Sequence, residues 1–383
     1  MSRIRVGVIG CGTIAQIMHL PYLRQLNDLF EISALCDVSR RVLDAMGEYY
    51  AVERRYTDYH ELLKLDLDAV LLLMSGSHAP PALAALKSGK HVLVEKPMCF
   101  TLAEADQLIE AAEASRRTLM VGYMKRYDPG YRHALSSLSR LGELRYIQIN
   151  TLHPAEAPIL NVPRLVQAGE VPAETLKQLA SEKDRLASEA IGPVSQTVKH
   201  IYADVLLGSL IHDINALRGL VGEPQAVEYT AIWPADEVLP VIATVLRMRD
   251  QLRAAFVWAY LPDYQDYFEE IALMSARGRI RIQFPSPYLR HFPTPIVIEG
   301  MQDGAAVKQH VTASYAEAFK EELLHFHSCL TTGMQPLTDA RDARKDIEIL
   351  QQILAAFNPP GLGGEAIRLR AQDAQRRSEQ EAR

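Results

Sequence analysis

A glycine-rich turn near the start of the chain has the residue spacing that holds a dinucleotide. Residues 10–15, Gly10-Cys11-Gly12-Thr13-Ile14-Ala15, fit the pattern GxGxxA between an expected strand and an expected helix. The first glycine permits a tight turn, the second lets the main chain approach a pyrophosphate, and the helix N-terminus faces the phosphates. Asp37 ends the next expected strand, where its carboxylate can accept hydrogen bonds from a ribose diol. We expect the cofactor to contact Gly10, Gly12, Thr13, Ile14 and Asp37.

The residues around Asp37 also bear on which dinucleotide binds. A carboxylate at this position favours NAD, because it would repel the 2′-phosphate of NADP. Arg40 and Arg41 weaken that preference, since either guanidinium could pair with such a phosphate. The alternative is that both arginines are solvated at the start of a surface helix. NAD is therefore the expected cofactor, with NADP as the alternative and Arg41 as a further contact.

The first third of the chain alternates short β-rich runs with amphipathic stretches. This order is typical of a doubly wound parallel sheet, because each amphipathic stretch is long enough for a right-handed crossover helix. We predict a Rossmann domain over residues 1–127. Its strands are expected at residues 4–9, 31–36, 69–74, 91–94 and 119–124, and its helices at 13–26, 40–49, 81–88 and 102–115.

The pattern changes after residue 127, where longer alternating runs predict an open, mostly antiparallel sheet. The fold class is therefore α/β, with an N-terminal Rossmann fold and an α+β domain over residues 128–367. Its strands are expected at 143–152, 226–232, 241–249, 252–260, 269–275, 278–282 and 296–300, and its helices at 203–221, 315–331 and 339–357. Apolar periodicity disappears in residues 368–383, so we expect a charged, flexible tail.

Composition excludes several classes of protein. The formal net charge of -6 offers no basic surface for nucleic acid. The four cysteines lack metal-ligand or CxxC spacing, so we expect reduced thiols, with neither a disulfide framework nor a metal site. The chain opens without an apolar signal segment, and no apolar run approaches the ~20 residues of a membrane span. These features predict a cytoplasmic protein with no membrane partner.

The run Gly89-Lys90-His91-Val92-Leu93-Val94-Glu95-Lys96-Pro97 joins the glycine turn in a wider resemblance. With residues 121–128 (VGYMKRYD), the helix that carries His212 and the ending from 319 to 357, the chain resembles the Gfo/Idh/MocA family of glucose-fructose oxidoreductase and inositol dehydrogenase. The EKP and MKRYD elements are most similar to the inositol dehydrogenase branch. The resemblance implies an NAD(P)-dependent oxidoreductase acting on sugars or cyclic polyols, with a substrate cleft between its domains. It also implies a homodimer or homotetramer formed through the C-terminal sheet.

Lys96 is the first catalytic candidate. The resemblance implies that the EKP lysine reaches both the nicotinamide ribose and the substrate hydroxyl, with Glu95 beside the cofactor. The residues agree, because a lysine at the carboxyl edge of a parallel strand points into the ligand crevice, and burial beside a cationic nicotinamide lowers its pKa. An ordinary solvated lysine is the alternative. The Lys96-Pro97 bond is a candidate for the cis form.

His212 is the second catalytic candidate, in the stretch Gly208-Ser209-Leu210-Ile211-His212-Asp213-Ile214-Asn215. The family commonly has aspartates four residues before this histidine and three after it, where this chain has Gly208 and Asn215. His212 therefore lacks a nearby anion to raise its basicity and orient its ring. Asp204 lies ~12 Å along the helix axis and Asp213 is turned ~100° away, so neither substitutes. A packed helix histidine remains the alternative.

Five further positions are weaker candidates. Arg126 and His153 match positions that contact polyol hydroxyls in inositol dehydrogenase-like members, and Asn215 joins them as a substrate-side candidate. Arg126 is equally well explained as a structural salt-bridge partner. Ser75 and His78 could border the cofactor, although His78 could equally contact the backbone at a helix start. Residues 154–198 are longer than the family's usual connection, which allows a lid or a solvated helix at 172–190.

These residues predict reversible hydride transfer between a carbinol carbon and nicotinamide, with Lys96 handling the hydroxyl proton and His212 assisting. Because Gly208 and Asn215 remove acceptors and open volume, a bulkier or less hydroxylated substrate is expected in place of a plain inositol. Two alternatives stay open. The chain could retain NAD and use transient oxidation for a net elimination, hydrolysis or epimerisation, or it could be a non-catalytic sensor that binds a dinucleotide.

Overall fold

The computed structural model describes residues 3–155, 165–169, 171–249 and 251–357, and it divides into two compact units. The first unit comprises Met1–Met124, Leu160–Leu186 and Ala318–Lys345, and the second comprises Lys125–Ile159, Ala187–Glu317 and Asp346–Arg383. This division differs from the expected boundaries, because residues 318–345 return to the first unit. The expected tail, 368–383, and part of the expected lid lie outside the described residues.

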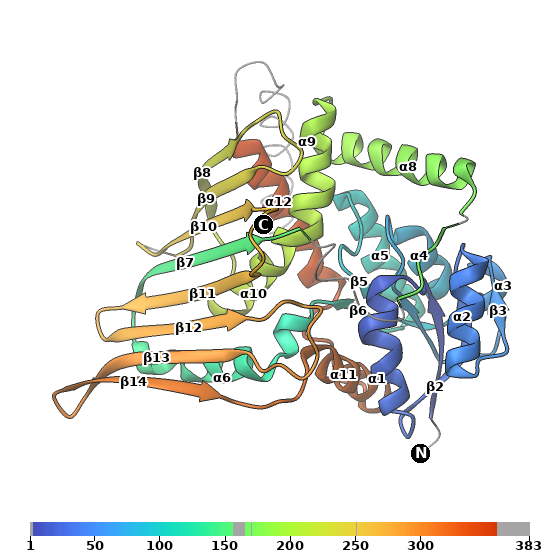
Figure 1. The fold of residues 1–383 in the computed structure, drawn as a ribbon, viewed down its shortest axis with the longest axis horizontal. Helices are drawn as coiled ribbons and strands as arrows, with labels where there is room; N and C mark the ends of the chain where they lie inside the picture. Colours follow the sequence, from blue (N-terminus) through green and yellow to red (C-terminus); the bar gives the residue numbers. More distant parts are fainter. Residues whose placement is uncertain (1–2, 156–164, 170, 250, 358–383) are drawn as a thin grey trace. The chain divides into compact units, whose positions relative to one another are not determined.

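The first unit is built on a six-stranded parallel sheet (Figure 1). Its strands, in the spatial order β3-β2-β1-β4-β5-β6, are β3 (Arg55–Tyr56), β2 (Phe30–Cys36), β1 (Ile4–Ile9), β4 (Ala69–Leu72), β5 (His91–Glu95) and β6 (Leu119–Gly122). This is the strand order of a dinucleotide-binding Rossmann fold, so that prediction is confirmed. Strands β1, β4 and β5 are almost wholly apolar and buried, because helices cover both faces of such a sheet.

The crossover helices begin with local signals that the sequence carries. They are η1 (Ala15–His19), α1 (Leu20–Gln25), α2 (Arg40–Tyr50), α3 (Tyr59–Leu63), α4 (Ala79–Lys87) and α5 (Leu102–Ser115). Thr101 caps α5 in a reciprocal capping box with Glu104. The segment after the glycine turn is wound as a π-helix in η1 before it becomes α-helical. The short elements β3 and α3 were not predicted, since they are too brief for a periodic pattern.

The second unit contains one eight-stranded sheet in the order β14-β13-β12-β11-β7-β10-β9-β8 (Figure 1). Every neighbouring pair is antiparallel except β7 with β10, which confirms the mostly antiparallel sheet. The strands are β7 (Leu144–His153), β8 (Ala226–Trp233), β9 (Val241–Arg247), β10 (Arg253–Tyr260), β11 (Phe268–Ser275), β12 (Gly278–Phe284), β13 (Pro295–Gln302) and β14 (Ala305–Thr312). The edge strand β14 was not predicted, because its apolar residues do not alternate with polar ones.

The remaining helices include one with an unusual winding. They are η2 (Met124–Tyr127), α6 (Pro129–Ser137), η3 (Leu138–Leu141), α8 (Ala173–Ile191), α9 (Gln196–His200), η4 (Ile201–Leu210), α10 (Ile211–Val221), α11 (Ala318–Thr332) and α12 (Ala340–Ala356). The expected helix at 203–221 is longer than predicted and runs through α9, η4 and α10, of which η4 is a π-helix. No helix in the described parts of the chain is long and apolar enough to cross a membrane.

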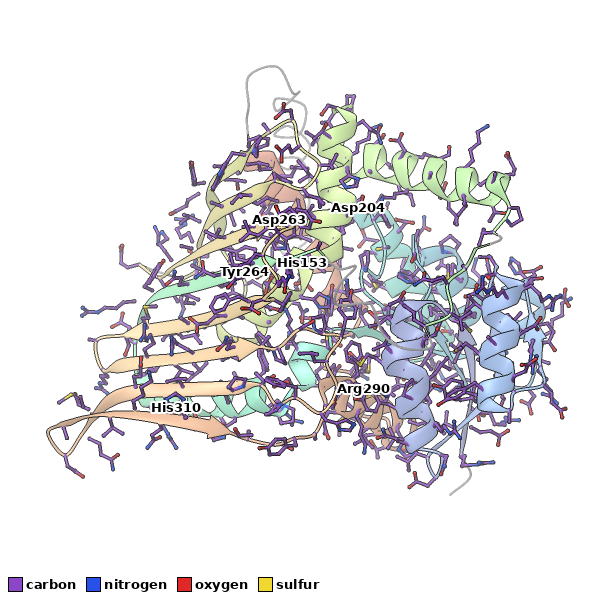
Figure 2. All side chains as sticks on the ribbon, viewed as in Figure 1. His153, Asp204, Asp263, Tyr264, Arg290 and His310 are labelled. Carbon is purple, nitrogen blue, oxygen red and sulfur yellow. The ribbon has the colours of Figure 1, made fainter. Side chains whose placement is uncertain are left out.

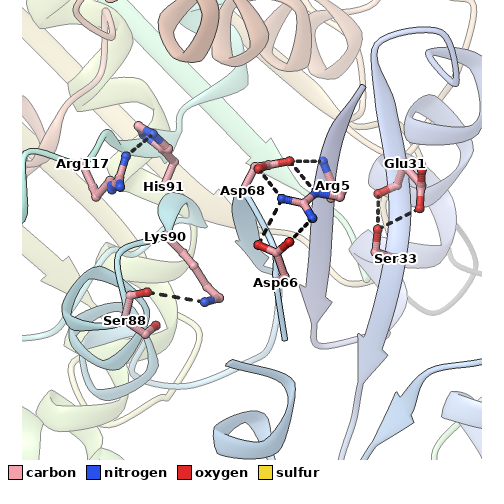
Figure 3. Close-up of polar contacts among 9 residues, drawn as sticks. All are labelled: Arg5, Glu31, Ser33, Asp66, Asp68, Ser88, Lys90, His91 and Arg117. Atoms are coloured by element: carbon pink, nitrogen blue, oxygen red, sulfur yellow. Dashed lines mark hydrogen bonds and ion pairs between the residues drawn. The ribbon is translucent and has the colours of Figure 1, made fainter. Parts of the chain in front are cut away.

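The amino-terminal edge of the first sheet is fixed by ion pairs (Figure 3). The Arg5 guanidinium donates to Asp68 at 2.9 and 3.1 Å and also binds Asp66, while the main-chain N–H of Arg5 donates to the Asp68 carboxylate at 2.8 Å. Asp68 immediately precedes β4, so these contacts hold β1 and β4 in register. They lie at the edge opposite to the one where ligands bind in such sheets.

Candidate active site

Four strands of the first sheet deliver the predicted cofactor residues to one edge. Because β1, β2, β4 and β5 are parallel, their carboxyl ends meet there. Gly10 follows β1, Asp37 follows β2, Ser75 and His78 follow β4, and Lys96 follows β5. In open α/β sheets this edge, at the point where the strand order reverses, is the ligand crevice.

The two glycines of the turn have different roles in the structure. Gly10 has φ +93°, and a Cβ there would lie 2.4 Å from the main-chain nitrogen of Met74. It is therefore required by close packing of the turn against the end of β4. A Cβ on Gly12 would meet no atom within 4 Å, and Gly12 is exposed. The turn thus leaves open space where a pyrophosphate would approach the main chain, so these residues fit a dinucleotide.

Asp37 holds the turn in place. One carboxylate oxygen accepts from the main-chain N–H of Cys11 at 2.7 Å, and the other accepts from that of Ser39 at 2.8 Å. Each oxygen keeps a second lone pair for a ribose hydroxyl. Thr13 and Ile14 are half-buried at the start of the following helix, and Arg41 is exposed in the first turn of α2.

A segment from a distant part of the sequence is bonded to the helix after the turn. Gln16 donates to the Cys11 carbonyl at 2.8 Å and to the Val166 carbonyl at 3.1 Å, and it accepts from the Val166 N–H at 2.9 Å. Val166, within residues 165–169 (the strap segment), is therefore bonded to the helix that follows the glycine turn. The strap segment belongs to the 154–198 connection that the sequence left as a lid or a solvated helix; α8 occupies much of its later part.

His78 is buried, and both of its ring nitrogens face main-chain carbonyls. Nδ1 lies 2.7 Å from the Pro97 oxygen and Nε2 lies 2.7 Å from the Met74 oxygen. Burial lowers the pKa of His78 despite these two acceptors. Its ring thus ties the end of β4 to the EKP run through the backbone, while Ser75 is exposed in the loop between them.

Glu95 fixes the main chain of Lys96. One of its carboxylate oxygens lies 2.7 Å from His19 Nε2, and the other accepts from the Lys96 N–H at 3.1 Å. Burial alone would raise the pKa of Glu95, but the hydrogen bond with His19 and the nearby charge of Lys96 lower it. Lys96 is half-buried, and the Lys96-Pro97 bond is cis as the sequence suggested.

The second unit contains a buried charge cluster around Asp213. Lys125 contacts Asp213 at 3.4 Å and also binds Glu269, and Thr151 donates to Asp213 at 3.1 Å. Burial and the charge of Glu269 raise the pKa of Asp213 well above its usual value. Burial alone would raise the pKa of Glu269, but the Lys125 charge lowers it. Lys125 thus pairs with both carboxyl groups of this buried cluster.

His212 and His153 lie on elements attached to this cluster. His212 is half-buried in the first turn of α10, immediately before Asp213. His153 ends β7 (Figure 2), and its ring packs against Trp258 at 6.0 Å and edge-on against Tyr267 at 5.7 Å. Trp258 donates through its indole N–H to Ser209 at 2.9 Å, next to Gly208.

Asp204, which the sequence ruled out as a partner of His212, is engaged within its own helix. Its carboxylate lies 2.8 Å from Nδ1 of His200, four residues earlier. The π-helical winding of η4 also separates these positions from the α-helical spacing assumed in the sequence argument.

Asn215 is placed differently from the expected substrate contact. It is 1% exposed, and its amide nitrogen donates to Asp346 at 2.7 Å. The Arg126 guanidinium donates to the carbonyl and the side-chain oxygen of Asn215 at 3.4 and 3.5 Å. The Asp346 carboxylate also accepts from the Arg218 guanidinium at 2.6 Å. Both ends of the Asn215 amide thus serve internal contacts, and Arg126 lies against α10.

Several buried polar residues were missed by sequence reasoning: His19, Lys125, Glu269, Glu322 and Asp346. One signal was available for Glu322, which lies at i+3 from Phe319 and so on the apolar face of its helix. Asp346 likewise lies three residues after Ala343 and four before Leu350, on the buried face of α12. The partners of these residues are distant in sequence, so pairing could not be read from spacing.

Residues 4–123 match the model of the GFO_IDH_MocA oxidoreductase family, described as having an NAD-binding Rossmann fold. A myo-inositol 2-dehydrogenase of Thermotoga maritima is 26% identical over 289 residues, which are 70% of this chain and 86% of that protein. An inositol 2-dehydrogenase of Salmonella paratyphi B is 36% identical over 132 residues, 33% of this chain and 39% of the relative's length.

Solved structures support the same fold over most of the chain. An aldose-aldose oxidoreductase of Caulobacter crescentus, complexed with glycerol, has a TM-score of 0.71 at 21% identity, covering 93% of this chain and 97% of that one. An oxidoreductase of Agrobacterium radiobacter, in complex with NAD+, L-tartaric acid and magnesium, has a TM-score of 0.69 at 16% identity, covering 93% and 96%. Residues 4–123 therefore match the NAD-binding Rossmann domain of the Gfo/Idh/MocA oxidoreductase family, and solved oxidoreductases share the fold over most of the chain.

Proposed function

We propose that this chain catalyses reversible hydride transfer between a nicotinamide dinucleotide and a hydroxyl-bearing carbon of a sugar, cyclic polyol or related bulkier compound. The observation that carries the proposal is that Gly12, Asp37 and Lys96 share the carboxyl edge of one parallel sheet, with open space over Gly12. The relatives named as inositol 2-dehydrogenases support the substrate class.

The proposed cofactor site uses the residues of this edge. Gly10 and Gly12, with Thr13 and Ile14 at the helix start, would hold the pyrophosphate, and Asp37 the ribose diol. Arg41 is exposed where it would meet a 2′-phosphate, so NADP stays an alternative to NAD. Ser75, His78 and Glu95 would border the nicotinamide half, with His78 acting through the Pro97 carbonyl. When bound, nicotinamide supplies the site that gains or gives up the hydride.

Lys96 is the proposed proton-handling residue. In the oxidation direction its neutral amine accepts the substrate hydroxyl proton while the hydride leaves the adjacent carbon, and as an ammonium it returns that proton in reduction. The Glu95 carboxylate accepts from the main-chain N–H of Lys96 and so fixes the backbone position from which the Lys96 side chain extends. His212 is proposed to hydrogen-bond the substrate hydroxyl or to relay its proton.

The substrate side is proposed to be shaped by a missing carboxylate. Gly208 offers no side chain where the family commonly has aspartate. The side-chain amide of Asn215 is hydrogen-bonded to Asp346 and Arg126. The lost acceptors favour a substrate with fewer hydroxyls or more bulk than a plain inositol. His153 remains the substrate-side candidate on a strand end, with Arg126 as a weaker one.

Replacement of Lys96 tests this assignment. Lys96→Ala should retain NAD binding, measured by quenching of protein fluorescence, and lose turnover of sugars, inositols or glycoside alcohols followed as NADH absorbance. Lys87→Ala, which changes an exposed lysine of α4, is the matched control and should remain active. Full activity of Lys96→Ala would overturn the proposed role.

A second candidate function is an enzyme that keeps its NAD bound and uses transient oxidation for a net elimination, hydrolysis or epimerisation. The strap segment favours it, because Gln16 bonds Val166 beside the turn that would hold the pyrophosphate. Such a chain should retain NAD through purification and convert substrate without a net change in nicotinamide absorbance. Purification without NAD, combined with stoichiometric NADH release on turnover, would exclude it.

We also propose that the second sheet mediates a homodimer or homotetramer. Its half-exposed face carries apolar side chains on neighbouring strands, including Val241, Val245 and Val257. Light scattering of the native chain should give a molar mass that is a multiple of 42.8 kDa, and the Val257→Glu variant should give a lower mass. A monomer in the native chain would contradict this proposal.

A further inference from the structure

Three ionisable side chains are enclosed in the first unit behind the EKP run. His19 and Glu322 are 0% exposed and Glu95 is 6% exposed. They come from three separate elements, η1, α11 and β5. Buried ionisable groups are uncommon unless they are paired, so their joint enclosure calls for a hydrogen-bonding scheme.

One side of this cluster is complete. The Glu95 carboxylate accepts from His19 Nε2 and from the Lys96 N–H, as described above. A carboxylate that accepts from Nε2 requires the proton on that nitrogen. The opposite ring nitrogen, Nδ1, is buried and has no hydrogen-bond partner within residues 3–155, 165–169, 171–249 and 251–357.

The other side is Glu322. Within the same described ranges, neither of its two buried carboxyl oxygens has a hydrogen-bond partner. Phe319, one turn earlier on α11, packs edge-on against the His19 ring with 5.3 Å between centroids. Residues three apart share a helix face, so Glu322 is presented toward the same region as His19. Burial and the negative charge of Glu95 raise the pKa of Glu322 well above its usual value.

We infer that Glu322 is a neutral carboxylic acid that positions the Glu95–Lys96 element by donating, through one buried water, to Nδ1 of His19. Buried waters typically join polar groups that otherwise lack partners. The scheme runs from the Glu322 O–H through water to Nδ1, and from the His19 Nε2–H to Glu95, which holds the Lys96 N–H. It fixes the His19 ring as neutral and leaves one negative charge, on Glu95. The role rests on the proposed function of Lys96, whereas the protonation of Glu322 does not.

The scheme predicts how the site responds when Glu322 is removed. Without the donor, Nδ1 is open to a proton, and an imidazolium beside Glu95 adds positive charge near Lys96. The charge of Lys96 acts on Glu95, so an added positive charge on the His19 ring would in turn act on the Lys96 amine. The limb of the pH–rate profile that reports Lys96 should move to lower pH by about one unit in Glu322→Ala. Glu322→Gln keeps an N–H donor and should retain the native profile.

The protonation of Glu322 can be tested by measurements that do not depend on enzyme activity. Infrared spectra at neutral pH should show a protonated-carboxyl band in the native protein that is lost in Glu322→Gln and kept in Glu321→Gln, a half-exposed neighbour on the same helix. Glu322 holds its proton in the folded state above the pH where the unfolded chain releases it, about 4.3. The stability of the native protein therefore falls as pH rises above that value. The melting temperature of Glu322→Gln minus that of the native protein should increase from pH 4 to pH 8.

The outcomes separate the two parts of the inference. A missing infrared band, or an advantage of Glu322→Gln that narrows with pH, would show Glu322 ionised and overturn the scheme. An unshifted pH profile in a folded Glu322→Ala variant with native NAD affinity would overturn the positioning role. If Glu322→Ala does not fold, the infrared and thermal measurements on Glu322→Gln still decide whether Glu322 is protonated. Failure of the Lys96 assignment is distinguishable, since it appears only as activity in Lys96→Ala.

Discussion

Adding one methyl group at either glycine of the turn should weaken NAD binding, but only at Gly10 should it also destabilise the fold. At Gly12 the new Cβ meets no atom within 4 Å and the main chain is outside the left-handed region, so Gly12→Ala should fold with a stability change within about 1 kcal/mol. The methyl would occupy the space that a pyrophosphate needs. Overpacking of this kind costs about 1–3 kcal/mol, which corresponds to NAD affinity lower by roughly 5- to 150-fold.

Gly10→Ala is the matched contrast. Its Cβ would lie 2.4–2.7 Å from main-chain atoms of Leu73 and Met74, at a φ of +93° that side chains rarely adopt. This variant should therefore lose stability as well as NAD binding, by at least about 2 kcal/mol. Thermal melting and NAD titration of both variants provide the assay. A folded Gly12→Ala protein that binds NAD as tightly as the native chain would refute the placement of the pyrophosphate over this turn.

Three further variants and measurements follow from contacts described above. Asp346→Ala removes the partner of Arg218 and Asn215 in the interior of the second unit, so it should cost about 3–5 kcal/mol in chemical unfolding, and Asp346→Asn should cost less; equal stability of all three proteins would contradict the buried pair. Asp37→Ala should lower the ratio of kcat/KM for NAD over NADP at least about tenfold, and an unchanged ratio would show that this carboxylate does not select the cofactor. Burial, with nearby Asp37 and Asp58, raises the pKa of the Cys36 thiol to about 12, so at pH 8 it should react with thiol reagents only after unfolding, and rapid labelling of the folded chain would contradict its burial.

The fold could be predicted because its signals are local and repeated. Strand β1, the glycine turn and helix α5 each follow from a few neighbouring residues, and the alternation of strands and helices indicates a parallel sheet. The open sheet of the second unit follows from period-two alternation in β9 and β10, where every second residue is buried. Edge strand β14 could not be predicted, because its side chains are mostly exposed and show no such alternation.

The candidate site was predicted less completely, because it depends on pairings between distant residues. The departure at Asn215 was visible in the sequence, but its partner Asp346 lies 131 residues later. The same applies to His19, which meets Glu95 from a position 76 residues earlier. Helical geometry predicts that Asp213 turns away from His212, but its contacts with Lys125 and Thr151 could be predicted only by knowing which strands adjoin α10.

The ten-residue π-helix η4, directly before His212, has a consequence for the length of this segment. Its hydrogen bonds span five residues where those of an α-helix span four, so the helix contains more residues per turn than its neighbours. Deleting Leu207 should let one turn tighten to α-helical winding while the helix persists. Because a π-turn holds about one more residue than an α-turn, the helix before the deletion should keep roughly its facing relative to His212. Such a variant should keep its far-UV circular dichroism, with Gly208 and His212 still in their native relation, and loss of the helical signal would contradict this expectation.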